Sequence, residues 1–233
     1  MDESRWERMG AAAGVIFVAL LALSAFLAPA PPKADASVQK IANYYLNHRK
    51  ALLGSAMFGT FAIVFFLWFL GHLRHVLQRA EGGHEALSPI VFGSGVALAT
   101  IGFISGIPGA TLAYHTARTG DRAAIRLLFD MGNIFGPLIG IIVGGFLAAT
   151  ATAMIMKELV APWLGWAGLA VALYSFVTGG LGIFATKGAL AGNGVVGLVG
   201  FVAFMVWVLV ASAAMIQHPE VVRERATPAI FAH

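Results

Sequence analysis

Cysteine is absent from this 233-residue chain, and charged residues are scarce. The lack of cysteine excludes disulfides, thiolate metal sites and cysteine nucleophiles. Charged residues make up 11% of the chain and apolar residues 59%, whereas soluble domains carry about a quarter charged residues. A water-exposed surface built from so few charges would hold large apolar patches. The composition therefore indicates an integral membrane protein.

Long stretches without charge define the expected spans. Asp130 is the only charged residue inside six apolar segments, which cover 10–32, 51–71, 86–114, 127–156, 159–186 and 188–219. Each reaches the roughly 20 residues that a helix needs to cross the hydrocarbon core. Membrane strands alternate polar and apolar residues over about ten positions, which these runs do not do. We predict an all-α bundle of six transmembrane helices in a single domain, 1–233, with spans at about 10–30, 51–76, 88–114, 125–156, 161–186 and 193–217.

The first span has a second interpretation, because residues 27–30 resemble the small-residue cleavage site of a secretory signal. Signal peptides begin with a positive segment, and residues 2–8 are net negative. We therefore expect this helix to be retained. The basic residues of the loops do not orient the bundle, since seven lie on the side of the termini and eight on the other. Short termini are simply left untranslocated, so we expect both in the cytoplasm and the chain in the cytoplasmic membrane.

The first loop, residues 33–50, contains a short amphipathic pattern. Pro31 and Pro32 end the first helix. Apolar and aromatic residues then recur at three- and four-residue steps, at Val38, Ile41, Tyr44 and Tyr45. This pattern predicts a short interfacial helix. Such a helix either covers a cavity as a lid or merely bridges two spans.

Asp130 and Asn133 are the first candidates for a polar site. An acid at membrane depth costs roughly 3 kcal/mol, and Asn133 lies three residues on, on the same helix face. Together they could line a cation or proton path. Arg126 stands four residues earlier, at ion-pair spacing, so simple pairing with Asp130 is the competing interpretation.

The histidines offer a candidate metal site. His72 and His75 share a face near the end of the second span, and His84 or Glu81 in the next loop would supply a third ligand. Histidines at membrane ends also act as plain interfacial hydrogen-bonding groups. No histidine pair suits haem ligation, and no cofactor is predicted.

Glycine and proline mark helix contacts and breaks. Gly102 and Gly106 in the third span are spaced for close helix packing. The fourth span repeats that spacing twice, so we expect these two helices to pack tightly, either on each other or on other helices. The glycines concerned are Gly102, Gly106, Gly136, Gly140 and Gly144. Pro108 and Pro137 should kink or interrupt their helices, and interrupted helices expose backbone groups to substrates in transporters.

One segment carries a family resemblance. The sequence Pro162-Trp-Leu-Gly-Trp-Ala-Gly168, which opens the fifth span, resembles a motif of uncharacterised multi-pass inner-membrane proteins of bacteria, of the domain-of-unknown-function type. The segment Leu73-Arg-His-Val-Leu77 fits the same group loosely. The resemblance implies a bacterial cytoplasmic membrane and no established activity.

Three functional hypotheses follow. The first is a non-catalytic membrane protein that binds a lipophilic ligand or a protein partner, as a homo-oligomer or as a subunit of a larger assembly, with membrane lipids as neighbours. The second is a small transporter that uses Asp130, Asn133, Pro137 and Pro108. The third is a redox or metal-binding protein that uses His72 and His75. Nucleic acid is not an expected partner, since no dense basic cluster is present.

Overall fold

A computed structural model describes residues 3–82 and 86–217, and in this part of the chain every regular element is helical. The helices follow one another along the chain as α1 (Glu3–Leu27), α2 (Val38–Asn47), α3 (Arg49–Glu81), α4 (Leu87–Thr111), the π-helix η1 (Leu112–Thr116), α5 (Ala117–Thr119), α6 (Arg122–Met156), α7 (Pro162–Gly182) and α8 (Val195–Gln217).

Five helical stretches are long and apolar enough to cross a membrane. They are α3, the continuous helical run Leu87–Thr119 (α4, η1 and α5), α6, α7 and α8. The shorter apolar stretch of α1, Ala12–Leu27, falls below that length. The all-helical, multi-pass character predicted from the charge-free runs is confirmed, whereas the count of six is not established by length and hydropathy alone.

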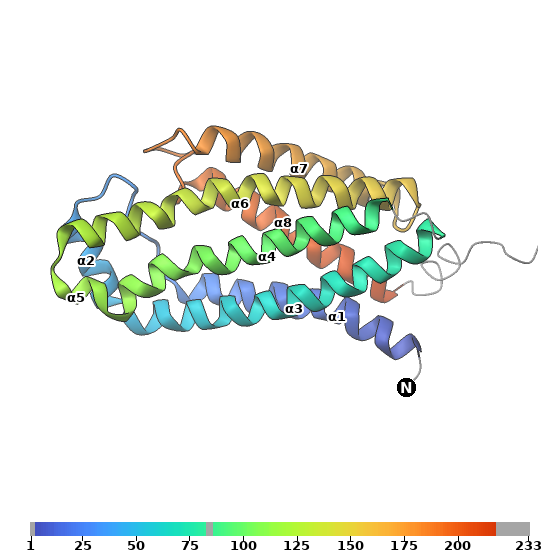
Figure 1. Cartoon of the computed structure of the whole chain (residues 1–233), viewed down its shortest axis with the longest axis horizontal. Coiled ribbons are helices and arrows are strands. Elements are labelled where there is room, and N and C mark those ends of the chain that lie inside the picture. Colours follow the sequence, from blue (N-terminus) through green and yellow to red (C-terminus); the bar gives the residue numbers. More distant parts are fainter. Residues whose placement is uncertain (1–2, 83–85, 218–233) are drawn as a thin grey trace, which may run out of the picture.

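The long helices lie lengthwise side by side (Figure 1), and their contacts close into a ring. Each long helix lies beside the next one along the chain, and α1 and α8 also lie side by side, which closes the ring. The bundle has two ends. We call the end that carries α2, α5 and residues 183–194 the α2 end, and the end where α1 begins and α8 finishes the terminal end.

Local capping interactions explain where several of the helices begin or end. The Asp121 carboxylate accepts hydrogen bonds from the backbone N–H groups of Ala123 at 3.0 Å and Ala124 at 3.2 Å, which caps α6. Ser37 caps α2 by accepting from the backbone of Lys40. Gly82 ends α3 with a φ of 64°, a left-handed conformation that glycine adopts without a Cβ clash.

The start of α4 is capped from outside the helix. The Glu81 side chain, at the end of α3, is only 7% exposed. Its carboxylate accepts the N–H groups of Leu87 at 2.6 Å and Ala86 at 3.3 Å, and the Ser88 hydroxyl at 2.6 Å. One buried acid thus satisfies the free backbone donors of the next span and fixes the turn between the two helices.

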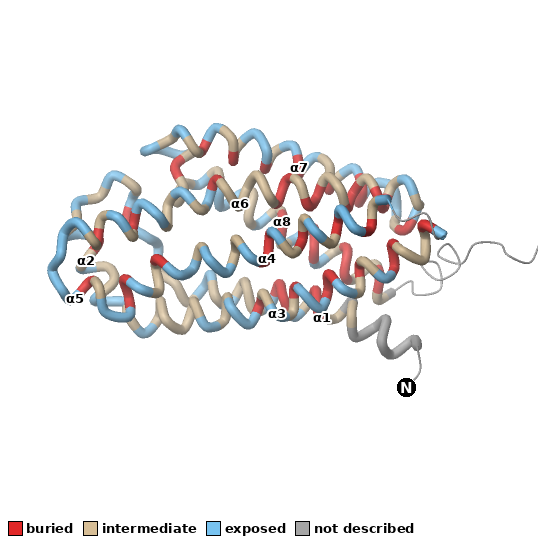
Figure 2. The backbone as a smooth tube through the Cα atoms, in the orientation of Figure 1, coloured by how far each residue is buried: buried red, intermediate tan, exposed pale blue. Residues whose placement is uncertain are grey.

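The packed core lies in the terminal half of the bundle. Four phenylalanines from four helices meet there: Phe17 of α1, Phe66 of α3, Phe146 of α6 and Phe204 of α8, with ring centroids 4.9–6.4 Å apart. Trp207 of α8 joins this core and donates its indole N–H to the backbone oxygen of Leu164 on α7 at 3.0 Å. Figure 2 shows buried residues concentrated along this half, with fewer toward the α2 end.

Candidate functional site

The helices of the ring pack less closely toward the α2 end, and α4 shows this change most clearly. Its buried residues Gly95 and Ala99 face the bundle, with Gly95 packed against Leu70 of α3. Seven residues are about two helical turns, so Gly102 and Gly106 continue that same face. A Cβ added at Gly106 would meet no atom within 4 Å, and one at Gly102 would meet only Ile63 Cδ1 at 3.9 Å.

The inward face of α3 behaves in the same way. Ala62 and Phe66 are buried, but Ser55 and Gly59, seven residues earlier on that face, are not. All residues from Ala51 to Ala56 are partly exposed. Because six consecutive residues point in all directions around a helix, even the side of α3 that faces the ring is accessible here.

The first and last spans complete the pattern. In α8 the buried positions begin at Phe204, and none of residues 195–203 is buried. In α1 they stop at Val18, and none of residues 19–27 is buried. The Ser24 and Ser55 hydroxyls lie 3.1 Å apart, and Ser24 also donates to the backbone oxygen of Ser55 at 2.8 Å. The α2 halves of α1, α3 and α8 are therefore made of residues that stay partly or fully exposed, and the Ser24 and Ser55 hydroxyls there bond to each other.

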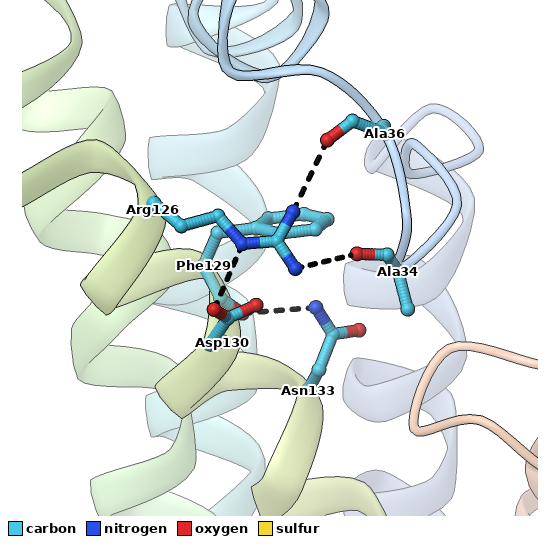
Figure 3. Close-up of polar contacts among 6 residues, drawn as sticks. All are labelled: Ala34, Ala36, Arg126, Phe129, Asp130 and Asn133. Atoms are coloured by element: carbon cyan, nitrogen blue, oxygen red, sulfur yellow. Dashed lines mark hydrogen bonds and ion pairs between the residues drawn. The ribbon is translucent and has the colours of Figure 1, made fainter. Parts of the chain in front are cut away.

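A connecting segment is fastened across this half. In residues 29–37, which we call the strap, four backbone oxygens accept hydrogen bonds from side chains outside the segment. Arg126 of α6 donates Nη1–H to Ala36 and Nη2–H to Ala34, both at 3.1 Å (Figure 3). Asn193, before α8, donates to Pro32, and Tyr44 of α2 donates to Pro29 at 2.6 Å.

Asp130 and Asn133 are both engaged in contacts near the strap. The Asp130 carboxylate accepts Nε–H of Arg126 at 2.8 Å, and its side chain is 51% exposed. The Asn133 amide donates to the backbone oxygen of Phe129, one turn earlier in its own helix, at 2.9 Å. Figure 3 shows Asp130 beside the guanidinium that holds the strap. Asp130 therefore contacts Arg126 and helps to position it. Within the described chain, no further acid joins Asp130 and Asn133 in a common polar site.

Pro137 shapes the contact between α6 and the loop before α8. Because proline has no N–H, the backbone oxygen of Asn133, four residues earlier, lacks its helical donor. Gly192 packs directly on that oxygen, so closely that an added Cβ would overlap it. A Cβ at Gly136 would lie 2.6 Å from the backbone oxygen of Gly192. The helix runs through Pro137 without interruption.

The other predicted packing residues divide between two faces. Gly140 lies against Gly179 and Ser175 of α7, with a Cβ position 3.4 Å from each backbone. Gly144 lies against Ala172 and Phe176 of α7. Close packing in α6 is therefore directed at α7, while the tight contact expected at Gly102 and Gly106 is not formed within the described chain.

Pro108 and the π-helix lie where α4 approaches α2. Pro108 is buried within α4, which continues to Thr111 before the wider turns of η1. Ile41 of α2 packs on Leu112 of η1 and on Ile125 and Phe129 of α6. The amphipathic helix predicted in the first loop is present, and its apolar face rests on the bundle. Burial there raises the pKa of Tyr45 to about 12, and the nearby Tyr44 adds to that rise.

The histidine pair does not form a metal site in the described chain. His72 packs against Gly10 of α1, where an added Cβ would overlap its ring, and His75 is exposed. No three metal-ligating side chains come together among residues 3–82 and 86–217. Glu81 is committed to α4, and His84 lies outside the described residues.

Several functional contacts were not predicted from the sequence. They join segments far apart in the chain: Arg126 to the strap, Asn193 to Pro32, and Gly192 to Asn133. The only sequence signal was the four-residue step from Asn133 to Pro137, which predicts a backbone oxygen without a helical donor.

The fold and the site define a class: an all-helical protein with five helices able to cross a membrane, arranged in a ring whose larger packed core lies in the terminal half and whose smaller cluster, around Ile41, lies at the α2 end. No family model, curated protein or solved structure matches this chain. The resemblance to uncharacterised inner-membrane proteins of bacteria therefore stays a prediction.

Proposed function

We propose that this chain is a six-span protein of the cytoplasmic membrane that binds a lipophilic molecule with an acyl chain inside the α2 half of its ring. The observation that carries the proposal is Gly106. It lies two turns after the buried Ala99, on the same side of α4, yet it is exposed and a side chain added there would touch nothing within 4 Å.

The side chains that face the interior of the α2 half indicate which class of ligand fits there. Protein interiors are close-packed, and an empty volume costs about 24 cal/mol per Å3, so an occupant of this space is favoured. The inward positions are glycine, serine and apolar residues such as Gly106, Ser55 and Phe201. The two serines already bond to each other, so the walls make no demand for a polar ligand. A hydrocarbon chain meets that description.

The sixth span of this proposal is α1. It has 25 residues, runs beside α3 and α8, and buries Ala13 and Phe17 in the core. A helix in that place completes the ring within the bilayer. Six crossings put the residues before α1 and those after α8 on one side of the membrane, and we place that side in the cytoplasm.

The transporter and metal alternatives receive less support from the geometry. Asp130 and Asn133 are bound to Arg126 and Phe129, and His72 is pressed against α1. These side chains hold the structure together in the described chain, and neither set converges on a common point.

The test compares two glycines of α4 that lie on opposite faces. Gly93 and Gly106 both have open space where a Cβ would stand, and both exchanges to leucine raise helix propensity by about 1 kcal/mol. The wild-type protein and both variants are purified in a mild detergent, and bound lipid is measured by native mass spectrometry. We expect Gly93→Leu to keep the lipid of the wild type and Gly106→Leu to lose most of it.

Two outcomes would count against lipid binding. One is a wild-type chain that carries no lipid beyond a detergent-exchangeable background. The other is equal lipid content in Gly93→Leu and Gly106→Leu while both unfold at the wild-type temperature. A defined protein that co-purifies with the wild type and is lost from Gly106→Leu would point instead to a partner helix in this space.

A further inference from the structure

The seam between α1 and α8 differs from every other contact in the ring. Every other pair of long helices that lie side by side around the ring is consecutive along the sequence, so a connection ties the two helices together at one end, whereas α6 and α8 touch across the core, as at Phe146 and Phe204. Only chain-distant contacts hold α1 to α8. The ring can therefore open between α1 and α8 without stretching a loop that directly connects the two separating helices.

The seam is tightly packed at the terminal end. Gly14 of α1 lies directly against the Ser212 hydroxyl of α8, so that an added Cβ would overlap it. The rings of Phe17 and Phe204 lie 6.3 Å apart at an edge-to-face angle of 69°. All four residues are buried. This half of the seam has the close packing of a permanent helix contact.

The other half of the seam is held differently. Neither residues 19–27 of α1 nor residues 195–203 of α8 are buried. Just beyond both stretches, the Asn193 amide donates to the backbone oxygen of Pro32 and so joins the segment after α1 to the loop before α8. We call this bond the latch. It ties the strap, which follows α1, to the residue that stands two positions before α8.

The strap that carries the latch is itself fastened by side chains. Its internal backbone bond runs from Ala36 N–H to the oxygen of Lys33 at 2.9 Å. The other strap oxygens described above are held by Arg126, Asn193 and Tyr44. Hydrogen bonds of this kind each shift an equilibrium by about fivefold to tenfold, so the strap can open without unfolding a helix.

We infer that the lipophilic ligand enters and leaves through the α2 half of the seam between α1 and α8, and that the strap and its latch control this passage. The inference rests on the proposed function, because it names the route to the same interior. A lipid reaches the seam from the bilayer without crossing water. Arg126 acts as a positioning residue, since its guanidinium holds the strap in place to present Pro32 to Asn193.

The absence of native cysteine makes a direct test possible. Pro32→Cys and Asn193→Cys are combined and joined by a short reducible bis-thiosulfonate reagent. Protein with its bound lipid is then mixed with vesicles of equal parts phosphatidylcholine and phosphatidylglycerol with deuterated chains, and lipid exchange is followed by native mass spectrometry. We expect joining to slow exchange about tenfold or more, as for a closed lid, and reductant to restore it.

A point variant tests the latch from the opposite direction. Asn193→Ala removes the donor to Pro32, and we expect lipid exchange about fivefold faster. The matched control is Asn43→Ala, which removes the 3.0 Å amide bond from Gln39 on the exposed face of α2 and should leave exchange unchanged. Hydrogen exchange of the strap amides should rise in Asn193→Ala and stay constant in Asn43→Ala.

The lipid present before mixing separates the two proposals. Bound lipid at the start, with equal exchange in joined and reduced protein, overturns the seam route and leaves lipid binding intact. The same holds if Asn193→Ala speeds strap amide exchange but not lipid exchange. A wild-type chain with no lipid at the start overturns lipid binding and the seam route together.

Discussion

Glu81 is the residue on which the turn between α3 and α4 depends. Its buried carboxylate accepts hydrogen bonds from Leu87, Ala86 and Ser88. Replacing a cap of this kind costs about 1–2 kcal/mol, and leaving buried donors unpaired adds to that cost. We expect Glu81→Ala to lower the free energy of unfolding by about 2–3 kcal/mol, measured by thermal or denaturant unfolding in mild detergent.

Glu81→Gln separates the acceptor from the charge. The glutamine oxygen keeps one acceptor, while its amide opposes the donors of the α4 start, so we expect a smaller loss than in Glu81→Ala. Asp35→Ala on the exposed strap is the control and should leave stability within about 0.5 kcal/mol of the wild type. Equal stability of the two Glu81 variants and the wild type would show that the α4 start does not need this cap.

Gly192 is constrained by a distant proline. Because Pro137 leaves the Asn133 oxygen without a helical donor, the loop before α8 approaches that oxygen more closely than a side chain allows. Gly192→Ala should destabilise the protein by about 1–3 kcal/mol, the usual cost of overpacking. Gly197→Ala is the control, since its Cβ would lie 3.8 Å from its nearest neighbour. Similar unfolding temperatures for the two variants would contradict the close approach.

At the scale of the helices, the features that depend on short-range sequence patterns could be predicted from the sequence. Charge-free runs gave the five long helices to within a few residues, and the amphipathic pattern gave α2. The pairing of Arg126 with Asp130 followed from their four-residue spacing. The direction in which each glycine face points was not predictable, because Gly-x-x-x-Gly spacing identifies a face and not its neighbour. Gly140 meets α7, whereas Gly106 meets no side chain.

Adjacent glycines of α6 allow a test of this directed packing. Gly144 is buried against Ala172 and Phe176 of α7, with its Cβ position 2.9–3.0 Å from them, whereas Gly145 has nothing within 4 Å. Gly144→Leu should separate α6 from α7 and lower the unfolding temperature sharply. Gly145→Leu should leave it unchanged or raise it, because leucine favours helix by about 1 kcal/mol over glycine. The reverse order would show that α6 turns a different face to α7.

For the molecule as a whole, we propose that the α2 half binds the ligand while the terminal half holds the helices together. The phenylalanine core and Trp207 give the terminal half a fixed packing that keeps the ring together. Glycine and serine on the same helix faces leave the α2 half unfilled. Function at one end of a bundle thus requires that stability be concentrated at the other, since a ring loosened at both ends would have no permanent contact between α1 and α8.

The number of times the chain crosses the membrane depends on whether α1 spans it. If α1 spans the membrane, the N-terminus lies on the side opposite to the α2 end. If only the five longer helices span it, the N-terminus lies on the same side as α2. Single cysteines are placed at Lys187 at the α2 end, at Lys157 at the terminal end, and before Met1. Each is labelled with a membrane-impermeant maleimide in right-side-out and in inverted vesicles.

Six crossings predict that the N-terminal cysteine and Lys157→Cys react in the same vesicles, and that Lys187→Cys reacts in the opposite ones. We also expect the N-terminal cysteine to react only in inverted vesicles, which places the termini in the cytoplasm. Labelling of the N-terminal cysteine together with Lys187→Cys would reduce the count to five. The seam would then lack a membrane-embedded α1, and a lipid could not reach the ring between α1 and α8 from the bilayer.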